Sequence, residues 1–169
     1  MGAGSACQGG DMPLLRALED RDVLDVLALN DRNVEALAPM DEARLRQLQG
    51  LADRFDVVEL DGALAGFVVT FAPGAAYDSD NYQWFAERYA DFYYLDRIVL
   101  HEDVRRRGLG GFVYDEMERT AKEHGRLTLE VNLVPRNEPS LAFHERRGYV
   151  EVGRLGDTSH LVSLMEKTL

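Results

Sequence analysis

The sequence predicts a mixed α/β (α+β) fold: a largely antiparallel, twisted sheet of about six or seven strands flanked by about four or five helices. Segments with strand-like alternation and segments with helical spacing of apolar residues follow one another along the chain. Asp61 and Gly62 separate two apolar runs and are typical of a tight antiparallel hairpin. A helical segment between residues 92–100 and 127–133 is typical of a β-α-β unit.

The N-terminal third is expected to hold one strand and two helices. Residues 14–18 form a short apolar run, and the acidic residues that follow suit a helix start. Apolar residues at helical spacing then predict a helix over 23–29. Pro39 ends this region, and Asp41 begins a second helix that extends to about residue 51.

The middle of the chain is expected to form the hairpin, with strands over 55–60 and 64–71. Residues 77–94 then interleave aromatic and acidic side chains, with a short helix expected over 81–89. Because aromatic rings and carboxylates both attract cations, this stretch is a candidate wall for a cationic acceptor, although core packing explains most of its rings.

The C-terminal part is expected to alternate strands and helices. An apolar face predicts a long helix that Gly125 stops, and Pro135 and Gly148 bound a second, shorter one. The elements expected here are strands over 92–100, 127–133, 149–155 and 161–165, and helices over 108–124 and 139–147.

Length and charge restrict the classes of function. We expect a flexible tail over residues 1–13 and one domain over 14–169. The tail lacks the basic start and apolar block of a signal peptide, and Cys7, the only cysteine, permits no internal disulfide. The net charge of −11 disfavours nucleic acid, and no apolar run approaches the roughly 20 residues that cross a bilayer. We therefore expect a cytoplasmic monomer or homodimer without a membrane partner.

Residues 104–111 differ from this acidic background, because three arginines lead into glycines at a helix start. Bare glycine backbone exposes N–H groups, the helix N-terminus adds partial positive charge, and arginine donates forked hydrogen bonds to phosphate. This pattern predicts a pyrophosphate site. The Walker pattern is absent because no Lys-Ser or Lys-Thr follows the glycines, and Val113 stands where a dinucleotide loop has its third glycine.

Two motifs together resemble the GNAT N-acetyltransferase superfamily. Its acetyl-CoA loop, Arg/Gln-x-x-Gly-x-Gly/Ala, is similar to residues 105–110, which read Arg-Arg-Arg-Gly-Leu-Gly. Its second motif, Asn-x-x-Ala-x-x-aromatic-Tyr-x-x-x-Gly-Phe, is similar to residues 137–149. There His144 stands at the position of the usual tyrosine, so the chain resembles a subgroup with His in place of Tyr. The motifs and their flanks cover residues 92–155.

The resemblance implies a GNAT-like fold with a central β-α-β unit that binds acetyl-CoA. The backbone of residues 98–100 would pair with the pantetheine arm, the amides of residues 106–111 would bind the pyrophosphate, and Asn137 would touch the pantetheine. The residues expected to contact acetyl-CoA (coenzyme A) are Ile98, Val99, Leu100, Arg105, Arg106, Arg107, Gly108, Leu109, Gly110, Gly111, Asn137, Ser140, Phe143 and His144.

The implied reaction is direct transfer of an acetyl group to the amino group of a small acceptor, for which a cationic amine is compatible with the acidic chain. The ammonium must lose a proton before it attacks, and the departing thiolate benefits from a proton. Asp96, expected on one strand face with Tyr94 and Ile98, is the first candidate base, and Glu130 is the second. His144, with an ordinary pKa of about 6.5, is the candidate acid. The alternatives are structural ion pairs for the acids and simple cofactor contact for His144.

Tyr93, Tyr94 and Asn132 are the candidate substrate-binding residues, because the two tyrosines lead from the aromatic stretch into the strand and Asn132 is expected on the same strand face as Glu130. No metal is expected, since Gly148 stands where a zinc-protease pattern starting at His144 needs its second His. Two rival functions stay open. The missing tyrosine permits a non-catalytic acyl-CoA-binding or sensor domain, whereas the loop pattern disfavours a nucleotide-binding oxidoreductase.

Overall fold

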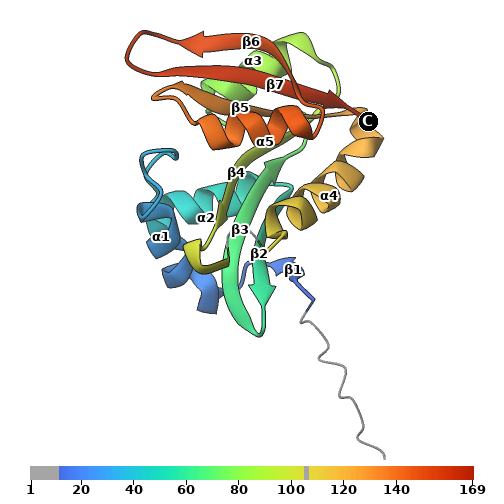
Figure 1. Cartoon of the computed structure of the whole chain (residues 1–169). Helices are drawn as coiled ribbons and strands as arrows, with labels where there is room; N and C mark the ends of the chain where they lie inside the picture. The colour runs from blue at the N-terminus through green and yellow to red at the C-terminus, as the bar shows by residue number, and fades with distance from the viewer. Residues whose placement is uncertain (1–11, 105–106) are drawn as a thin grey trace, which may run out of the picture.

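The computed structural model describes residues 12–104 and 107–169, and its strands form one sheet in the order β1-β2-β3-β4-β5-β7-β6 (Figure 1). Every neighbouring pair is antiparallel except β4 and β5, which are parallel. The predicted largely antiparallel α/β fold is thereby confirmed. The strands are β1 (Leu14–Ala17), β2 (Arg54–Leu60), β3 (Ala63–Phe71), β4 (Tyr93–Leu100), β5 (Arg126–Val134), β6 (Val150–Gly156) and β7 (Leu161–Thr168).

Side-chain caps begin three of the helices. Asp41, Ser79 and Asn137 each accept a hydrogen bond from the backbone N–H three residues later, at 2.7, 3.3 and 3.2 Å. None of the helices in the described ranges is long and apolar enough to cross a membrane. The α-helices are α1 (Val23–Asp31), α2 (Glu42–Leu51), α3 (Asp80–Arg88), α4 (Leu109–Ala121) and α5 (Glu138–Arg146), and 3-10 turns cover Asp20–Asp22, Glu102–Val104 and Lys122–His124.

The predicted hairpin joins β2 and β3 through Asp61 and Gly62. Their φ angles are 56° and 76°, so both residues adopt the left-handed conformation that a two-residue hairpin turn of this kind requires. Asp tolerates this conformation better than most side chains and Gly adopts it freely. The local sequence therefore fixes the turn and the first pairs beside it, and a register shift between Val58 and Glu59 sets the pairing beyond them.

The sheet separates two apolar cores (Figure 1). Helices α1, α2 and α3 pack on one face, with Leu45 and Phe85 among their fully buried residues. Helices α4 and α5 pack on the other face, with Val113 and Met117 among theirs. Both faces of the sheet carry residues with no solvent exposure, so the sheet is the middle layer of the molecule. Functional groups on the sheet must therefore lie at its ends or at gaps between its strands.

Asp96 interrupts the pairing of β4 with β3, because the register between the two strands shifts there by one residue. Residues two apart normally share a strand face, but an extra residue resets the alternation. Tyr94 accordingly belongs to the core under α1–α3, while Ile98 packs against the core under α4 and α5. The expectation that Tyr94, Asp96 and Ile98 share one face is therefore wrong.

Candidate active site

Strands β4 and β5 pair only where they begin. Tyr93 pairs with Leu127 and Tyr94 with Thr128, after which the two strands diverge (Figure 1). Among the described residues, positions 95–100 of β4 have no strand partner on that side, so their backbone groups are open to an extended ligand. We call this gap the wedge. A pocket of about 640 Å³ opens from it and is lined by both strands, α5, Tyr114 and the loop after α1.

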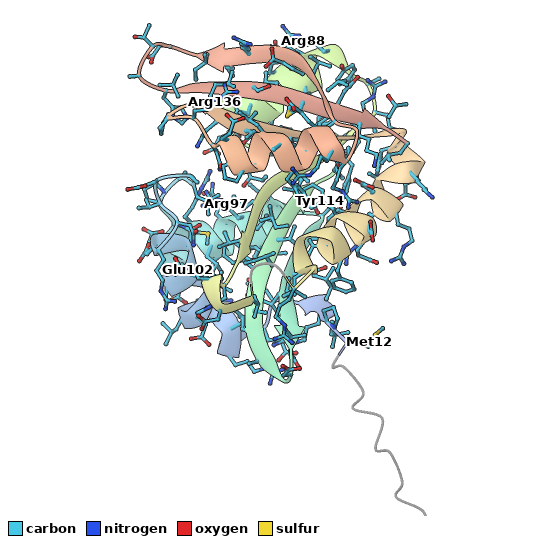
Figure 2. All side chains as sticks on the ribbon, viewed as in Figure 1. Met12, Arg88, Arg97, Glu102, Tyr114 and Arg136 are labelled. Carbon is cyan, nitrogen blue, oxygen red and sulfur yellow. The ribbon has the colours of Figure 1, made fainter. Side chains whose placement is uncertain are left out.

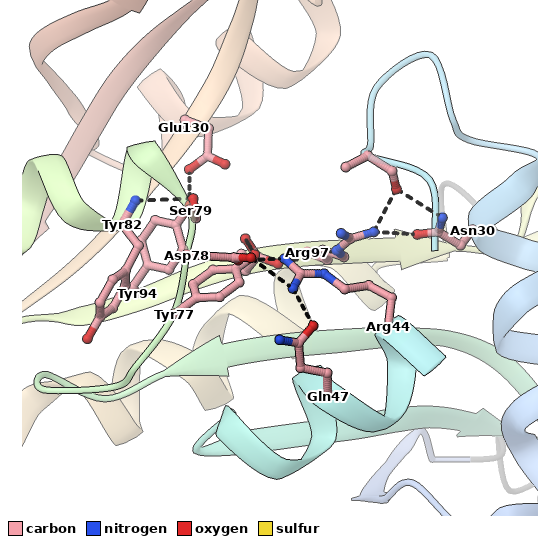
Figure 3. Close-up of polar contacts among 12 residues, drawn as sticks. Asn30, Arg44, Gln47, Tyr77, Asp78, Ser79, Tyr82, Tyr94, Arg97 and Glu130 are labelled. Carbon is pink, nitrogen blue, oxygen red and sulfur yellow. Dashed lines mark hydrogen bonds and ion pairs between the residues drawn. The ribbon is translucent and has the colours of Figure 1, made fainter. Parts of the chain in front are cut away.

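Glu130 of β5 lines this pocket and accepts a hydrogen bond of 2.7 Å from the Tyr94 hydroxyl (Figure 3). Burial raises the pKa of Glu130 to about 8, and the charge of Asp96 adds to this, while hydrogen bonds from Tyr94 and Asn81 oppose it. Within the described ranges no cationic side chain forms an ion pair with Glu130. This carboxyl is therefore poised to gain or lose a proton near neutral pH.

Asp96 lines the same pocket but has a charged neighbour. Its carboxylate accepts a hydrogen bond of 2.8 Å from the Tyr77 hydroxyl and lies 3.3 Å from Nε of Arg97. Burial raises the pKa of Asp96, whereas Arg97 lowers it. Arg97 is held in turn by Asn30 and by the carbonyl oxygen of Ala38, at 3.0 and 2.8 Å. The structural ion pair that was the alternative for Asp96 is thus present.

His144 and Tyr114 form a buried pair, which we call the dyad. Tyr114 comes from α4 and lies on the opposite side of β4 from Arg97 (Figure 2). The Tyr114 hydroxyl lies 2.5 Å from Nε2 of His144, and Nδ1 of His144 lies 2.7 Å from the carbonyl oxygen of Ser140. A nitrogen facing a carbonyl at that distance carries the proton, so neutral His144 accepts the Tyr114 hydrogen at Nε2. Burial lowers the pKa of His144 and raises that of Tyr114.

The N-terminus of α4 has the features of an anion site. Gly108 precedes the helix with φ of 77°, and as a glycine it has no side chain to cap the first-turn N–H groups. No acidic residue lies in that first turn. The start of α4 lies close to α5, since a Cβ added at Gly110 would be 3.7 Å from the Phe143 ring. Arg107 is 53% exposed and 4.0 Å from Asp61. Arg105 and Arg106 lie outside the described residues.

The sequence matches one family over most of its length: the model of the acetyltransferase (GNAT) family covers residues 22–149.

The chain belongs to the GNAT acetyltransferase family.

Solved structures of similar fold include acetyltransferases. Ard1 from Thermoplasma volcanium is 17% identical, with a TM-score of 0.73 over 93% of this chain and 97% of its own. The ribosomal-protein-S18-alanine N-acetyltransferase from Escherichia coli is 22% identical, with a TM-score of 0.66 over 93% and 94%. A putative phosphinothricin N-acetyltransferase is 20% identical, with a TM-score of 0.70 over 93% and 98%. At such identities the likeness concerns the GNAT fold alone.

The predicted substrate-binding residues of this GNAT protein are separated by the sheet. Asn132 lines the pocket, and Tyr94 lies behind it with its hydroxyl on Glu130. Tyr93 faces the other core, where its hydroxyl donates to Asp53 at 2.6 Å and bonds Thr70. Tyr93 does not line the pocket, and its hydroxyl is engaged by Asp53 and Thr70 instead. The expectation for Tyr93 is corrected on this ground.

The second motif lies at the wedge. Asn137 and Ser140 line the pocket at the start of α5, and Ile98 lines it from β4. Phe143 stands behind them, packed edge-on against Tyr114 with ring centres 5.0 Å apart. Tyr114 was not predicted as a site residue. In the sequence it belongs to the apolar face of a helix, and only its hydroxyl distinguishes it from a core residue.

Proposed function

We propose that this GNAT protein transfers the acetyl group of acetyl-CoA directly to the amino group of a small acceptor bound in the pocket. The observation that carries the proposal is the unpaired edge of β4, which passes from the N-terminus of α4 to the buried carboxyls Asp96 and Glu130. Membership of the family supplies the class of acyl donor. We also propose that the protein represents a subgroup with His144 in place of the usual tyrosine.

The residues of the wedge fit acetyl-CoA. Backbone N–H groups of residues 108–111 and the exposed Arg107 suit the pyrophosphate, together with Arg105 and Arg106. The open edge of residues 98–100 suits an extended amide-bearing arm, because such an arm forms strand-like hydrogen bonds. Asn137 and Ser140 face the same space from α5.

The charges of the pocket support an amine as the acceptor. Asp78 is paired with Arg44 at 2.7 Å (Figure 3), and Asp96 is paired with Arg97. Glu130 forms no ion pair among the described residues, although the charge of Arg97 acts to lower its pKa, and a positively charged ligand would supply a direct partner. A small cationic amine satisfies this requirement, whereas an anionic acceptor would add to the repulsion.

In this proposal Glu130 is the base, ahead of Asp96. Glu130 takes the proton of the ammonium, directly or through water, and the freed nitrogen attacks the thioester carbonyl carbon. The C–N bond forms and the C–S bond breaks, with its electron pair left on sulfur. Unpaired backbone N–H groups of β4 are suited to bind the carbonyl oxygen as it gains charge. Asp96 is less suited to the role, because Arg97 stabilises its charged form.

Thiol release from acetyl-CoA, measured with single amines from a panel of diamines, polyamines, amino-acid amides and short peptides, tests this function. We expect release that depends on the amine, with the acetylated amine identified by mass spectrometry. Binding of acetyl-CoA without amine-dependent release across the panel would contradict the proposal and favour the non-catalytic acyl-CoA-binding domain.

A further inference from the structure

We propose that Tyr114 is a catalytic residue, the hydroxyl that hydrogen-bonds and protonates the leaving sulfur, and that His144 is the positioning residue that holds this hydroxyl and restores its proton. The inference rests on the proposed acetyl transfer. The role of facing the sulfur thereby falls to Tyr114 of α4, which lies in the core under α4 and α5 and lines the pocket. It does not fall to His144 of α5, the residue at the motif position.

His144 cannot serve the sulfur by itself. Its Nδ1 is directed at the carbonyl oxygen of Ser140 at 2.7 Å, with the Ser140 hydroxyl at 3.3 Å. Its Nε2 is directed at the hydroxyl of Tyr114 at 2.5 Å. Both ring nitrogens therefore have protein partners. A proton that leaves Nε2 passes first to the oxygen of Tyr114.

Tyr114 is held in one place by its neighbours. Only 3% of its surface is exposed, and the rings of Phe143 and Tyr149 meet it edge-on at 5.0 and 6.0 Å between centres. A phenol oxygen has one proton and accepts hydrogen bonds as well. Neutral His144 takes the phenolic proton as a hydrogen-bond acceptor. When His144 is protonated, its Nε2–H donates to the Tyr114 oxygen instead, and the phenolic proton becomes available to a group in the pocket.

Tyr114 in turn cannot serve the sulfur alone. A thiol has an ordinary pKa of about 8.5, and burial raises the pKa of Tyr114 well above that of an ordinary phenol. Net transfer of its proton to a thiolate is therefore unfavourable. A protonated imidazole, with a pKa lowered by burial, is a stronger acid than a thiol. The two residues together can therefore do what neither can do alone.

The proton movements then balance. As the C–S bond breaks, sulfur keeps the electron pair and takes the phenolic proton of Tyr114. The phenolate oxygen takes the proton from Nε2 of a His144 that solvent has protonated. Coenzyme A leaves as a thiol, His144 returns to its neutral form, and the proton from the acceptor amine leaves through Glu130.

Charges around the dyad favour its neutral form at rest. Arg147 lies 5.4 Å from the centre of the Tyr114 ring, and its charge adds to burial in lowering the pKa of His144. Arg147 is itself tied to Asp115 at 2.8 Å and to Glu118 at 3.1 Å. Burial raises the pKa of Tyr114, the charge of Arg147 opposes this rise, and the charges of Glu118 and Glu130 add to it. A thiolate in the pocket adds the negative charge that draws a proton onto His144.

The test uses the pKa of the thiol of bound coenzyme A, followed through thiolate absorbance against pH in the intact protein. We expect Tyr114→Phe to raise this pKa by about one to two, as the loss of a hydrogen bond to an ion predicts. It should also lower kcat about 10- to 100-fold, with KM for acetyl-CoA changed far less. His144→Phe should raise the thiol pKa in the same direction, and the double variant should add little to either single one.

Tyr149→Phe is the matched control. Tyr149 packs edge-on against both rings of the dyad, but its hydroxyl donates to Glu118 at 3.0 Å. Coenzyme A bound to Tyr149→Phe should therefore have the same thiol pKa as coenzyme A bound to the wild type. If the wild type and both dyad variants bind coenzyme A and give it the same thiol pKa, the inference is overturned and the proposed function is left intact. A wild type that does not bind coenzyme A would instead remove the proposed function itself.

Discussion

Two carboxyls of one pocket differ in their partners, and this difference separates their roles. Asp96 has the guanidinium of Arg97 at 3.3 Å, which stabilises its charged form. Glu130 has hydroxyl and amide partners, and burial raises its pKa to about 8. Burial raises the pKa of Asp96 as well, but Arg97 opposes that rise, whereas Glu130 has no ion-pair partner to oppose it and titrates near neutral pH, where a base exchanges protons most readily. At the scale of single residues, the assignment of the base therefore follows from which acid has a cation.

This assignment predicts a pH dependence with a definite sign. The base is the deprotonated form of Glu130, so kcat/KM should rise with pH through about 8 and then level off. Glu130→Gln should lower kcat/KM by about 100- to 10,000-fold and remove this rise. The measurement is kcat/KM against pH for the wild type, Glu130→Gln and Asp96→Asn. A rise that persists in Glu130→Gln and disappears in Asp96→Asn would assign the base to Asp96.

Part of this chemistry could be predicted from the sequence. Acids inside apolar strands stand out, so Asp96 and Glu130 are recognisable as candidates. Which of the two is the better base cannot be predicted from the sequence. The ranking depends on the ion pair of Asp96 with Arg97 and on the bulge at Asp96, which arises from the pairing of β4 with β3. Tyr114 is hidden for a related reason. A tyrosine on an apolar helical face shows its role only when the packing of α5 brings His144 to its hydroxyl.

At the scale of elements, α3 is fixed by a contact with the edge of the sheet. The Trp84 ring covers Gly153 of β6, and the guanidinium of Arg88 stacks over that ring at 3.7 Å. This docking holds the start of α3, from which Asn81 hydrogen-bonds Glu130. Together with the buried rings of Tyr82 and Phe85, this contact positions α3 beside the pocket.

Gly153→Ala should therefore destabilise the protein. The added Cβ would lie 2.4 Å from a carbon of the Trp84 ring, so the indole must move, and overpacking of this kind costs about 1–3 kcal/mol. Gly50→Ala is the control, since nothing lies within 4 Å of a Cβ there and alanine favours a helix. Urea unfolding measures both. Equal midpoints for Gly153→Ala and the wild type would show that Trp84 does not dock as described.

At the scale of the whole molecule, local patterns predicted the order of strands and helices, and the structure confirms it to within a few residues. Asp61, Gly62 and Gly125 act locally, so their turns could be read directly. The wedge could not, because it depends on where two distant strands stop pairing. Only the resemblance to a family indicated that something binds between them.

The central claim is that acetyl-CoA binds in the wedge with its pyrophosphate at the start of α4, and titration calorimetry of Gly110 variants tests it most directly. Gly110→Ala should bind acetyl-CoA as tightly as the wild type, because its Cβ would lie at an ordinary contact distance of 3.7 Å from Phe143. Gly110→Asp should weaken binding at least about tenfold by charge repulsion, although an acid in a first helical turn favours the helix. NAD and ATP serve as ligand controls. Equal affinity of Gly110→Asp and Gly110→Ala for acetyl-CoA, or no binding by the wild type, would contradict the account.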